Sequence, residues 1–193
     1  MTNSGPADGP TFVDRTFTGA LAVEAGTTFE RCAFDGVNLQ AADLSRCRFL
    51  ECRFASSNLS VARVAAAVFR DAAFRDSKLS GIDWTCAARM SVVAFEKCVL
   101  DQCAFVGMDL RKIVLRGCRL REAVFADANL GEADLRDADL TGAQFAKTKL
   151  VKADLRGARG YVIDPHENDV AGMRASMPDA AALVVALGVD VTL

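Results

Sequence analysis

Histidine is nearly absent from this chain, in which His166 is the only one among 193 residues. The seven cysteines are an odd number and include no Cys-x-x-Cys pair. These counts argue against a zinc site and against a disulfide framework, and they favour a reducing compartment. No apolar run approaches the roughly 18 residues that a membrane helix needs. We therefore expect a cytoplasmic protein that binds no metal and no membrane.

The patterns that usually accompany catalysis are missing too. The sequence has no Gly-rich phosphate loop and no recognisable spacing between a nucleophile and a base. We therefore expect a protein that is not an enzyme and has no cofactor. The first ten residues contain neither a basic region nor an apolar one, so we do not expect them to be a signal peptide. Residues 1–11 are expected to form a disordered lead.

What the chain does have is a five-residue period. Every fifth residue is apolar from Phe29 to Trp84 and, after one six-residue step, from Met90 to Leu155. All 26 of these positions, here called centres, are apolar, and 23 are Leu or Phe. The residue two positions before the centre is Ala, Cys, Ser or Thr in 21 of the 26 pentads. The exceptions are Val37, Ile82, Val93, Met108 and Ile113.

A period of five fits neither an α-helix nor an ordinary strand. It fits a coil that turns a corner every five residues, with large centres and small residues inside. Centres twenty residues apart carry like side chains, as Phe29, Phe49 and Phe69 do. Each coil therefore has four sides, and neighbouring coils bury their faces against one another.

The repeat is most regular in residues 123–157, which include Ala-Asn-Leu-Gly-Glu, Ala-Asp-Leu-Arg-Asp and Ala-Asp-Leu-Thr-Gly. It resembles the pentapeptide-repeat family over residues 29–158 and, less clearly, over residues 12–28. The resemblance implies an all-β solenoid, a right-handed quadrilateral β-helix. We expect this β-helix over residues 12–160, with about 20 residues per coil as the column spacing indicates.

The register slips once, at residues 85–90, where one extra residue must bulge. Six of the seven cysteines occupy the small position and are expected to be buried, whereas Cys86 is the thiol most expected to be exposed. Two interpretations of the slip remain open. Trp84 fills a locally widened core, or Trp84, Thr85, Cys86 and Arg89 form a loop that contacts a partner.

Residues 161–193 depart from the repeat and are expected to cap the open end of the coil. Ser176–Asp179 resembles a capping box before an apolar helical segment that ends at Gly188. Residues 189–193 are then expected to form a short strand. The segment is more apolar than a cap requires, so we expect an α-helical dimerisation segment and an end-to-end homodimer. The expected interface residues are Leu183, Val184, Leu187, Val189 and Val191.

This end, together with Gly81-Ile82-Asp83-Trp84-Thr85, resembles the pentapeptide-repeat proteins that protect DNA gyrase. That group includes the fluoroquinolone-resistance and albicidin-resistance types. The resemblance implies a bacterial, dimeric DNA mimic that binds DNA gyrase or topoisomerase IV, binds no nucleic acid directly, and protects the enzyme from poisons. The poison and the biological setting are left open by the sequence.

Coil spacing near 4.8 Å gives a rod of about 30–40 Å and a dimer of about 70–90 Å, which matches roughly 20–25 base pairs. Residues 161–193 hold five acidic side chains and one basic, whereas residues 87–160 hold 10 acidic and 13 basic. The alternative for the acids of the coil is an ordinary solvated surface, and the alternative function is a scaffold for another partner. The carboxylates expected to face a topoisomerase are Asp134, Asp139, Asp154, Asp164, Glu167, Asp169 and Asp179.

Overall fold

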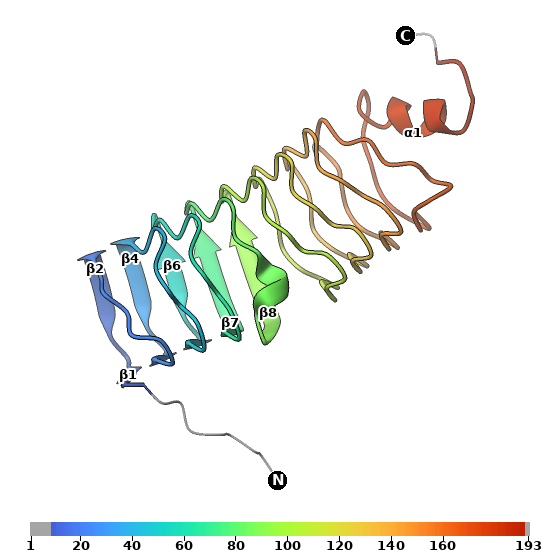
Figure 1. Cartoon of the computed structure of the whole chain (residues 1–193). Coiled ribbons are helices and arrows are strands. Elements are labelled where there is room, and N and C mark those ends of the chain that lie inside the picture. Colours follow the sequence, from blue (N-terminus) through green and yellow to red (C-terminus); the bar gives the residue numbers. More distant parts are fainter. Residues whose placement is uncertain (1–8, 192–193) are drawn as a thin grey trace.

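The computed structural model describes residues 9–191, which form one rod of stacked coils with a short helix at its C-terminal end (Figure 1). Residues 1–8, most of the expected lead, and residues 192–193 lie outside the described part. The elements are β1 (Thr11–Val13), β2 (Thr16–Ala20), β3 (Thr28–Glu30), β4 (Ala33–Asn38), β5 (Arg48–Leu50), β6 (Arg53–Ala55), β7 (Val68–Arg75), the 3-10 helix η1 (Trp84–Cys86), β8 (Arg89–Glu96) and α1 (Ala181–Ala186).

All strand pairings are parallel, and from β3 onward they carry the register expected from the repeat. The first coil is shorter, because Phe12 pairs with Phe29 and Phe17 with Phe34. Phe29 pairs with Phe49, and Phe49 with Phe69, so each of these coils advances the chain by twenty residues. Single bridges continue this register after β8, as far as the pair Asp154 and Arg174. The structure therefore confirms the predicted all-β, four-sided β-helix, and the stacking continues past residue 160.

The centres form the core, as predicted. Stacked phenylalanine rings lie with centroids 4.3 Å apart for Phe34 and Phe54, and 5.2 Å apart for Phe105 and Phe125. Six cysteines are buried and Cys86 is exposed, which confirms both expectations. Centre and small residue share the interior, where they form one continuous core.

The residue before each centre explains why Asp and Asn recur in the repeat. The side chain of Asp43 accepts a hydrogen bond from the backbone N–H of Ser45, and Asn58 accepts one from Ser60. Short polar side chains form such bonds to the backbone two residues on and so stabilise turns. The corner that follows has a positive φ, for example 60° at Arg46.

The extra residue at the slip is absorbed in η1, at one corner. The backbone N–H of Ala66 donates to the carbonyl of Cys86, and that of Ala88 donates to Ala67, so the slipped coil remains bonded to the coil before it. From Arg89 onward β8 pairs in full register with β7. The slip is therefore a one-turn bulge that leaves the ladder to the preceding coil intact.

Two expectations for the C-terminal segment are wrong. The capping box does not start a helix, because α1 begins at Ala181 with Ala180 as an uncapped N-cap. Ser176 Oγ instead accepts a hydrogen bond from the backbone N–H of Gly157, and Asp179 Oδ1 accepts one from Gly160. These side chains tie the segment to the last coil. Residues 189–191 form no strand, so the expected terminal strand is absent from its described part.

Candidate functional site

The C-terminal end of the rod exposes apolar side chains on and after α1. Leu183 packs against the core, whereas Val184, Leu187 and Val189 are 39%, 55% and 51% exposed. Val191, which the sequence placed with them, is half-buried. We call Val184, Val185, Leu187 and Val189 the terminal patch. Contiguous exposed apolar side chains of this kind are typical of an interaction surface.

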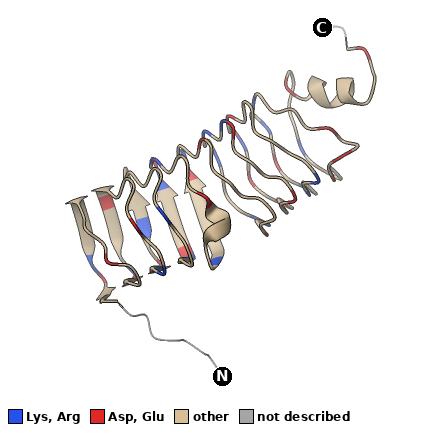
Figure 2. Cartoon of the chain, viewed as in Figure 1, with Lys and Arg blue, Asp and Glu red and all other residues tan. Residues whose placement is uncertain are grey.

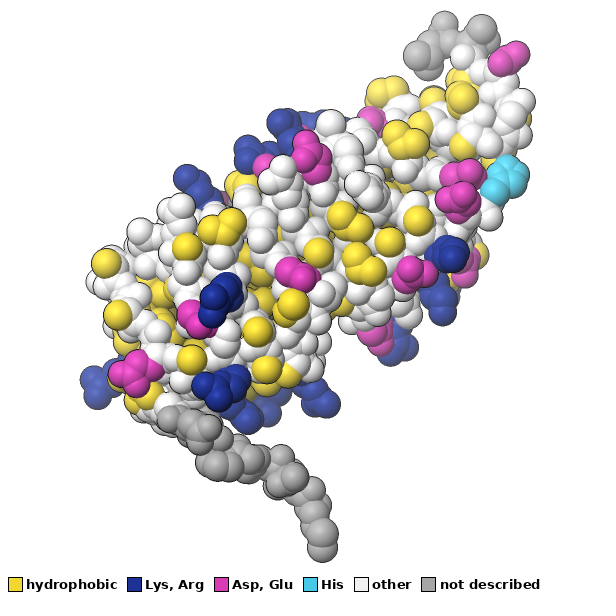
Figure 3. All heavy atoms as spheres, viewed as in Figure 1, with side chains coloured by type: hydrophobic (Ala, Val, Ile, Leu, Met, Phe, Trp, Pro, Cys, Tyr) yellow, Lys and Arg dark blue, Asp and Glu magenta, His cyan; other side chains and the backbone are white. Residues whose placement is uncertain are grey.

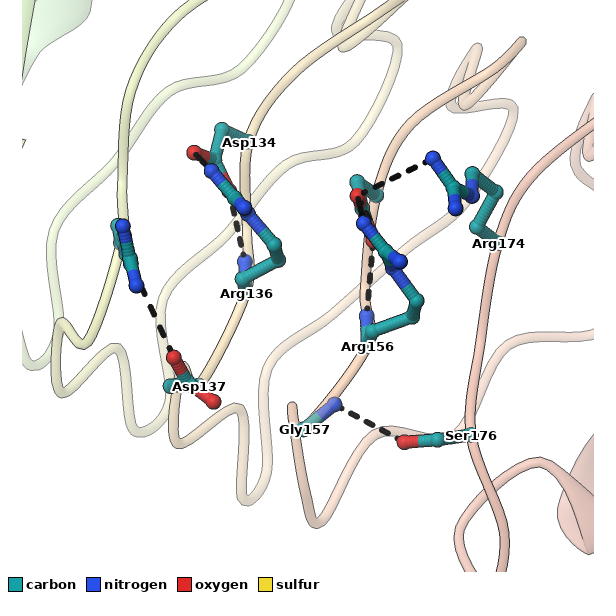
Figure 4. A network of polar contacts seen from close by, with 9 residues as sticks. Asp134, Arg136, Asp137, Arg156, Gly157, Arg174 and Ser176 are labelled. Atoms are coloured by element: carbon teal, nitrogen blue, oxygen red, sulfur yellow. Dashed lines mark hydrogen bonds and ion pairs between the residues drawn. The ribbon is translucent and has the colours of Figure 1, made fainter.

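Two aspartates of the coil that were expected to face a partner form ion pairs with arginines. Asp134 and Asp154 lie on one face of adjacent coils, as their twenty-residue separation predicts. Arg136 Nη2 lies 2.6 Å from Asp134 Oδ2, and Arg156 Nη2 lies 2.6 Å from Asp154 Oδ2 (Figure 4). These hydrogen bonds lower the pKa of Asp134 and hold that of Asp154 at about 2. Both carboxylates are therefore charged, but their charge is compensated in place.

Asp139 on the next face is even less available. Its side chain is 6% exposed and binds two arginines at 2.9 Å, Arg121 from the preceding coil and Arg159 from the following one. Thr141 donates to its other oxygen through both its hydroxyl and its backbone N–H. Although burial opposes ionisation, these hydrogen bonds keep the pKa of Asp139 well below its usual range. Asp139 is thus a structural ion-pair centre between three coils.

The acids of the tail are more open. Asp164, Glu167 and Asp169 are exposed, whereas Asp179 is half-buried and bound to Gly160. Acidic and basic side chains are otherwise interspersed along the coils (Figures 2 and 3). Of the carboxylates predicted to face a partner, the three on the coils are therefore paired with arginines, whereas Asp164, Glu167 and Asp169 are exposed in the C-terminal segment.

Of the four residues predicted to form a contact loop at the slip, one is buried and three are exposed. Trp84 is fully buried among phenylalanines, with its ring stacked 6.4 Å from that of Phe105. Thr85, Cys86 and Arg89 are exposed. Of the four predicted residues, a partner can therefore touch only these three. The hydrogen bond that Cys86 donates to Asp83 raises the pKa of the thiol, so it is a poor nucleophile.

Beside the slip lies a groove that sequence reasoning missed. It has a volume of about 640 Å³ and is lined by Met90–Val93, Asp109–Ile113 and Glu132. We call it the slip groove. The sequence did contain a sign of the groove. Five pentads have a large residue in the small position, and three of these residues, Val93, Met108 and Ile113, lie at or next to the groove.

Two further features bear on function. Within residues 9–191, no group of three or more His, Cys, Asp or Glu side chains is placed to hold a metal ion. None of the helices in the described part of the chain is long and apolar enough to cross a membrane.

Comparison with known families gives two matches, to a pentapeptide repeat region over residues 26–88 and to eight copies of pentapeptide repeats over residues 118–157. Together these segments make up more than half of the chain. A search of proteins with curated functions returned no match.

Among solved structures, two trypsin-treated variants of QnrB1, a plasmid-mediated fluoroquinolone resistance protein, are similar to the whole chain. One is 18% identical with a TM-score of 0.63, covering 94% of this chain and 97% of its own. The other is 17% identical with a TM-score of 0.64, covering 94% and 98%. HetL from the cyanobacterium Nostoc, a pentapeptide repeat protein involved in heterocyst differentiation regulation, is 18% identical with a TM-score of 0.37, covering 88% and 87%. At these identities the likeness is one of fold.

Proposed function

Because the chain belongs to the pentapeptide-repeat family, we propose that it is a non-catalytic, DNA-mimicking rod that binds DNA gyrase or topoisomerase IV and protects it from poisons. The terminal patch carries this proposal. It places apolar side chains at one end of a regular rod, where a second copy would join two rods end to end. The fold likeness to a fluoroquinolone resistance protein extends over nearly the whole of both chains.

In this proposal the dimer supplies the length of the mimic. The mimic acts in the cytoplasm of a bacterium and has no nucleic acid of its own as a ligand. Its negative charge comes from the tail rather than from the coils, since Asp134, Asp139 and Asp154 are held by arginines. Duplex DNA carries about one charge per 1.7 Å, so recognition would depend on shape along the coils and on charge only near the dimer centre.

The test is a DNA cleavage and supercoiling assay with purified gyrase and topoisomerase IV. Adding the protein is expected to reduce cleavage stabilised by a fluoroquinolone and to preserve supercoiling. A second series with albicidin asks which class of poison is countered. Absence of gyrase binding and of any change in cleavage with either poison would overturn the proposal.

The second candidate is a scaffold that binds another protein. The slip groove favours it, because this feature interrupts the regular rod and bears no relation to DNA shape. A protein that is a monomer at assay concentrations and does not bind a topoisomerase would support this second candidate.

A further inference from the structure

At the slip groove the backbone ladder between two coils is open. The regular ladder one coil further on has four hydrogen bonds, from Leu110 to Asn129, Lys112 to Gly131, Asn129 to Met108 and Asp134 to Ile113, at 2.8–2.9 Å. In the described chain no backbone hydrogen bond joins residues 88–92 to residues 108–113. Pairing resumes at the bridge between Ala94 and Val114, where the N–H of Phe95 donates to the carbonyl of Val114 at 2.8 Å.

The opening has a cause in the sequence. The extra residue in η1 is absorbed against the preceding coil, to which β8 is fully paired. On the other side, Val93, Met108 and Ile113 stand where Ala, Cys, Ser or Thr is the rule. Larger side chains inside a packed coil force its backbone to shift. The shift and the slip together separate β8 from the coil that follows.

Both walls of the groove are strand edges with backbone groups that have no partner across the gap. By the register of the regular ladder, one wall offers the N–H groups of Met90 and Val92, and the other offers that of Asp109. The carbonyls of Ala88, Asp109 and Arg111 are the matching acceptors. A strand edge of this kind is a template for pairing with another segment of chain.

The side chains around the groove narrow the choice of occupant. Asp109 Oδ2 lies 2.7 Å from Arg111 Nη2, and Lys112 Nζ lies 3.9 Å from Glu132 Oε2, so the four charges cancel. The apolar side chains of Met90, Val92, Leu110 and Ile113 line the rest. A charged ligand gains nothing from such a lining, whereas an uncharged segment loses no charge solvation. The volume lies within the range of ligand sites.

We propose that the slip groove binds an extended, uncharged segment of a partner protein, which adds as a parallel strand between β8 and residues 109–113. Parallel addition satisfies the N–H and C=O groups of both walls in the register that the rest of the rod uses. This inference is independent of topoisomerase binding, because it rests on the open ladder and on the side chains that line the groove.

The test uses the full chain and a capped peptide, Ala-Ser-Ser-Asn-Leu-Ser-Val-Ala, which copies the uncharged residues 55–62 of the regular coil. Amide hydrogen exchange is followed by NMR. Without peptide, the amides of Met90 and Val92 should exchange at least about 100-fold faster than those of Leu110 and Lys112. Saturating peptide should slow Met90, Val92 and Asp109 by at least about tenfold.

Three control peptides make the test specific. A version with alternate N-methylated amides keeps the side chains but cannot complete the ladder, and a scrambled version keeps the composition. Neither should slow exchange. A version with two lysines in place of two serines should bind more weakly. Equal protection by the N-methylated or scrambled peptide, or tighter binding of the lysine peptide, would overturn the proposal.

A deletion variant tests the structural cause. Removing Ala87 leaves Trp84-Thr85-Cys86-Ala88-Arg89-Met90, a regular pentad step. The ladder should then close, so that Met90 and Val92 become protected without peptide and peptide has no effect. If this variant does not fold, the peptide experiments on the wild-type protein still test the proposal. Slow exchange of Met90 and Val92 in the free wild-type protein, or no response to peptide up to about millimolar concentration, would show that the groove does not take a strand.

Discussion

Asp134 lies directly beneath Asp154 on adjacent coils, and each carboxylate is bound by the arginine two residues later in its own pentad. Two like charges so close would repel if they were bare. The arginines compensate both charges, so that this face carries paired charges of opposite sign (Figure 4). The result is a face whose charge stabilises the stack rather than one that displays negative charge to a partner.

The first prediction concerns acid stability. The pKa of Asp154 in the folded protein is about 2, against roughly 3.9 in an unfolded chain. Its contribution to stability is therefore complete above about pH 5 and is lost as the pH falls toward 2. Urea unfolding from pH 5 to pH 2.5 should show a falling free energy of unfolding, with a smaller fall in Asp154→Asn. The exposed tail variant Glu167→Gln serves as the control, and an equal slope in wild type and Asp154→Asn would contradict the assignment.

Asp139 should matter more for stability than any exposed acid. Asp139→Asn keeps the size of the side chain but removes the charge that holds Arg121 and Arg159, so we expect a loss of about 1–3 kcal/mol. Asp137→Asn is the matched control, because its carboxylate is 62% exposed and 3.8 Å from Arg116. That change should cost less than about 0.5 kcal/mol. Comparable losses of unfolding free energy in the two variants would refute the role given to Asp139.

The fold could be predicted from the sequence because the five-residue period fixes the positions of both the centre and the small residue. The ion-pair partners of Asp139 and Asp154 could not be predicted, since the repeat shows which residues share a face but not which arginine binds which carboxylate. The slip was visible as a six-residue step, yet its effect on the following ladder depends on how the extra residue is accommodated. Ser176 and Asp179 misled because a capping pattern describes local bonding, and the last coil offered the backbone N–H groups of Gly157 and Gly160 instead.

Trp84 should act as core filling and not as a contact residue. Its Nε1–H has no hydrogen-bond partner, so Trp84→Phe loses no polar contact and should cost less than about 1.5 kcal/mol. Trp84→Ala leaves a large cavity and should cost about 3–5 kcal/mol. Denaturant unfolding of the two variants measures both values. A severe loss in Trp84→Phe would show that the indole makes a contact beyond packing.

If the protein binds gyrase, its exposed tail acids should contribute more than the paired acids of the coil. The triple variant Asp164→Asn, Glu167→Gln, Asp169→Asn should weaken binding about five- to tenfold at low salt, chiefly through slower association. Asp134→Asn, whose charge is already compensated by Arg136, should change binding little. Surface plasmon resonance at two salt concentrations separates these effects. Weaker binding by Asp134→Asn than by the triple variant would place the contact on the coils.

The terminal patch gives the sharpest prediction about assembly. Leu187 is 55% exposed at the end of α1, and a buried charge without a partner is costly in an apolar interface. Leu187→Asp should therefore convert a dimer to a monomer in sedimentation velocity while the circular dichroism of the coils stays unchanged. Val162→Asp is the matched control, since Val162 is 78% exposed on the last coil and lies outside the patch. Dissociation by Val162→Asp and not by Leu187→Asp would move the interface to the side of the rod, where two coils would lie side by side instead of end to end.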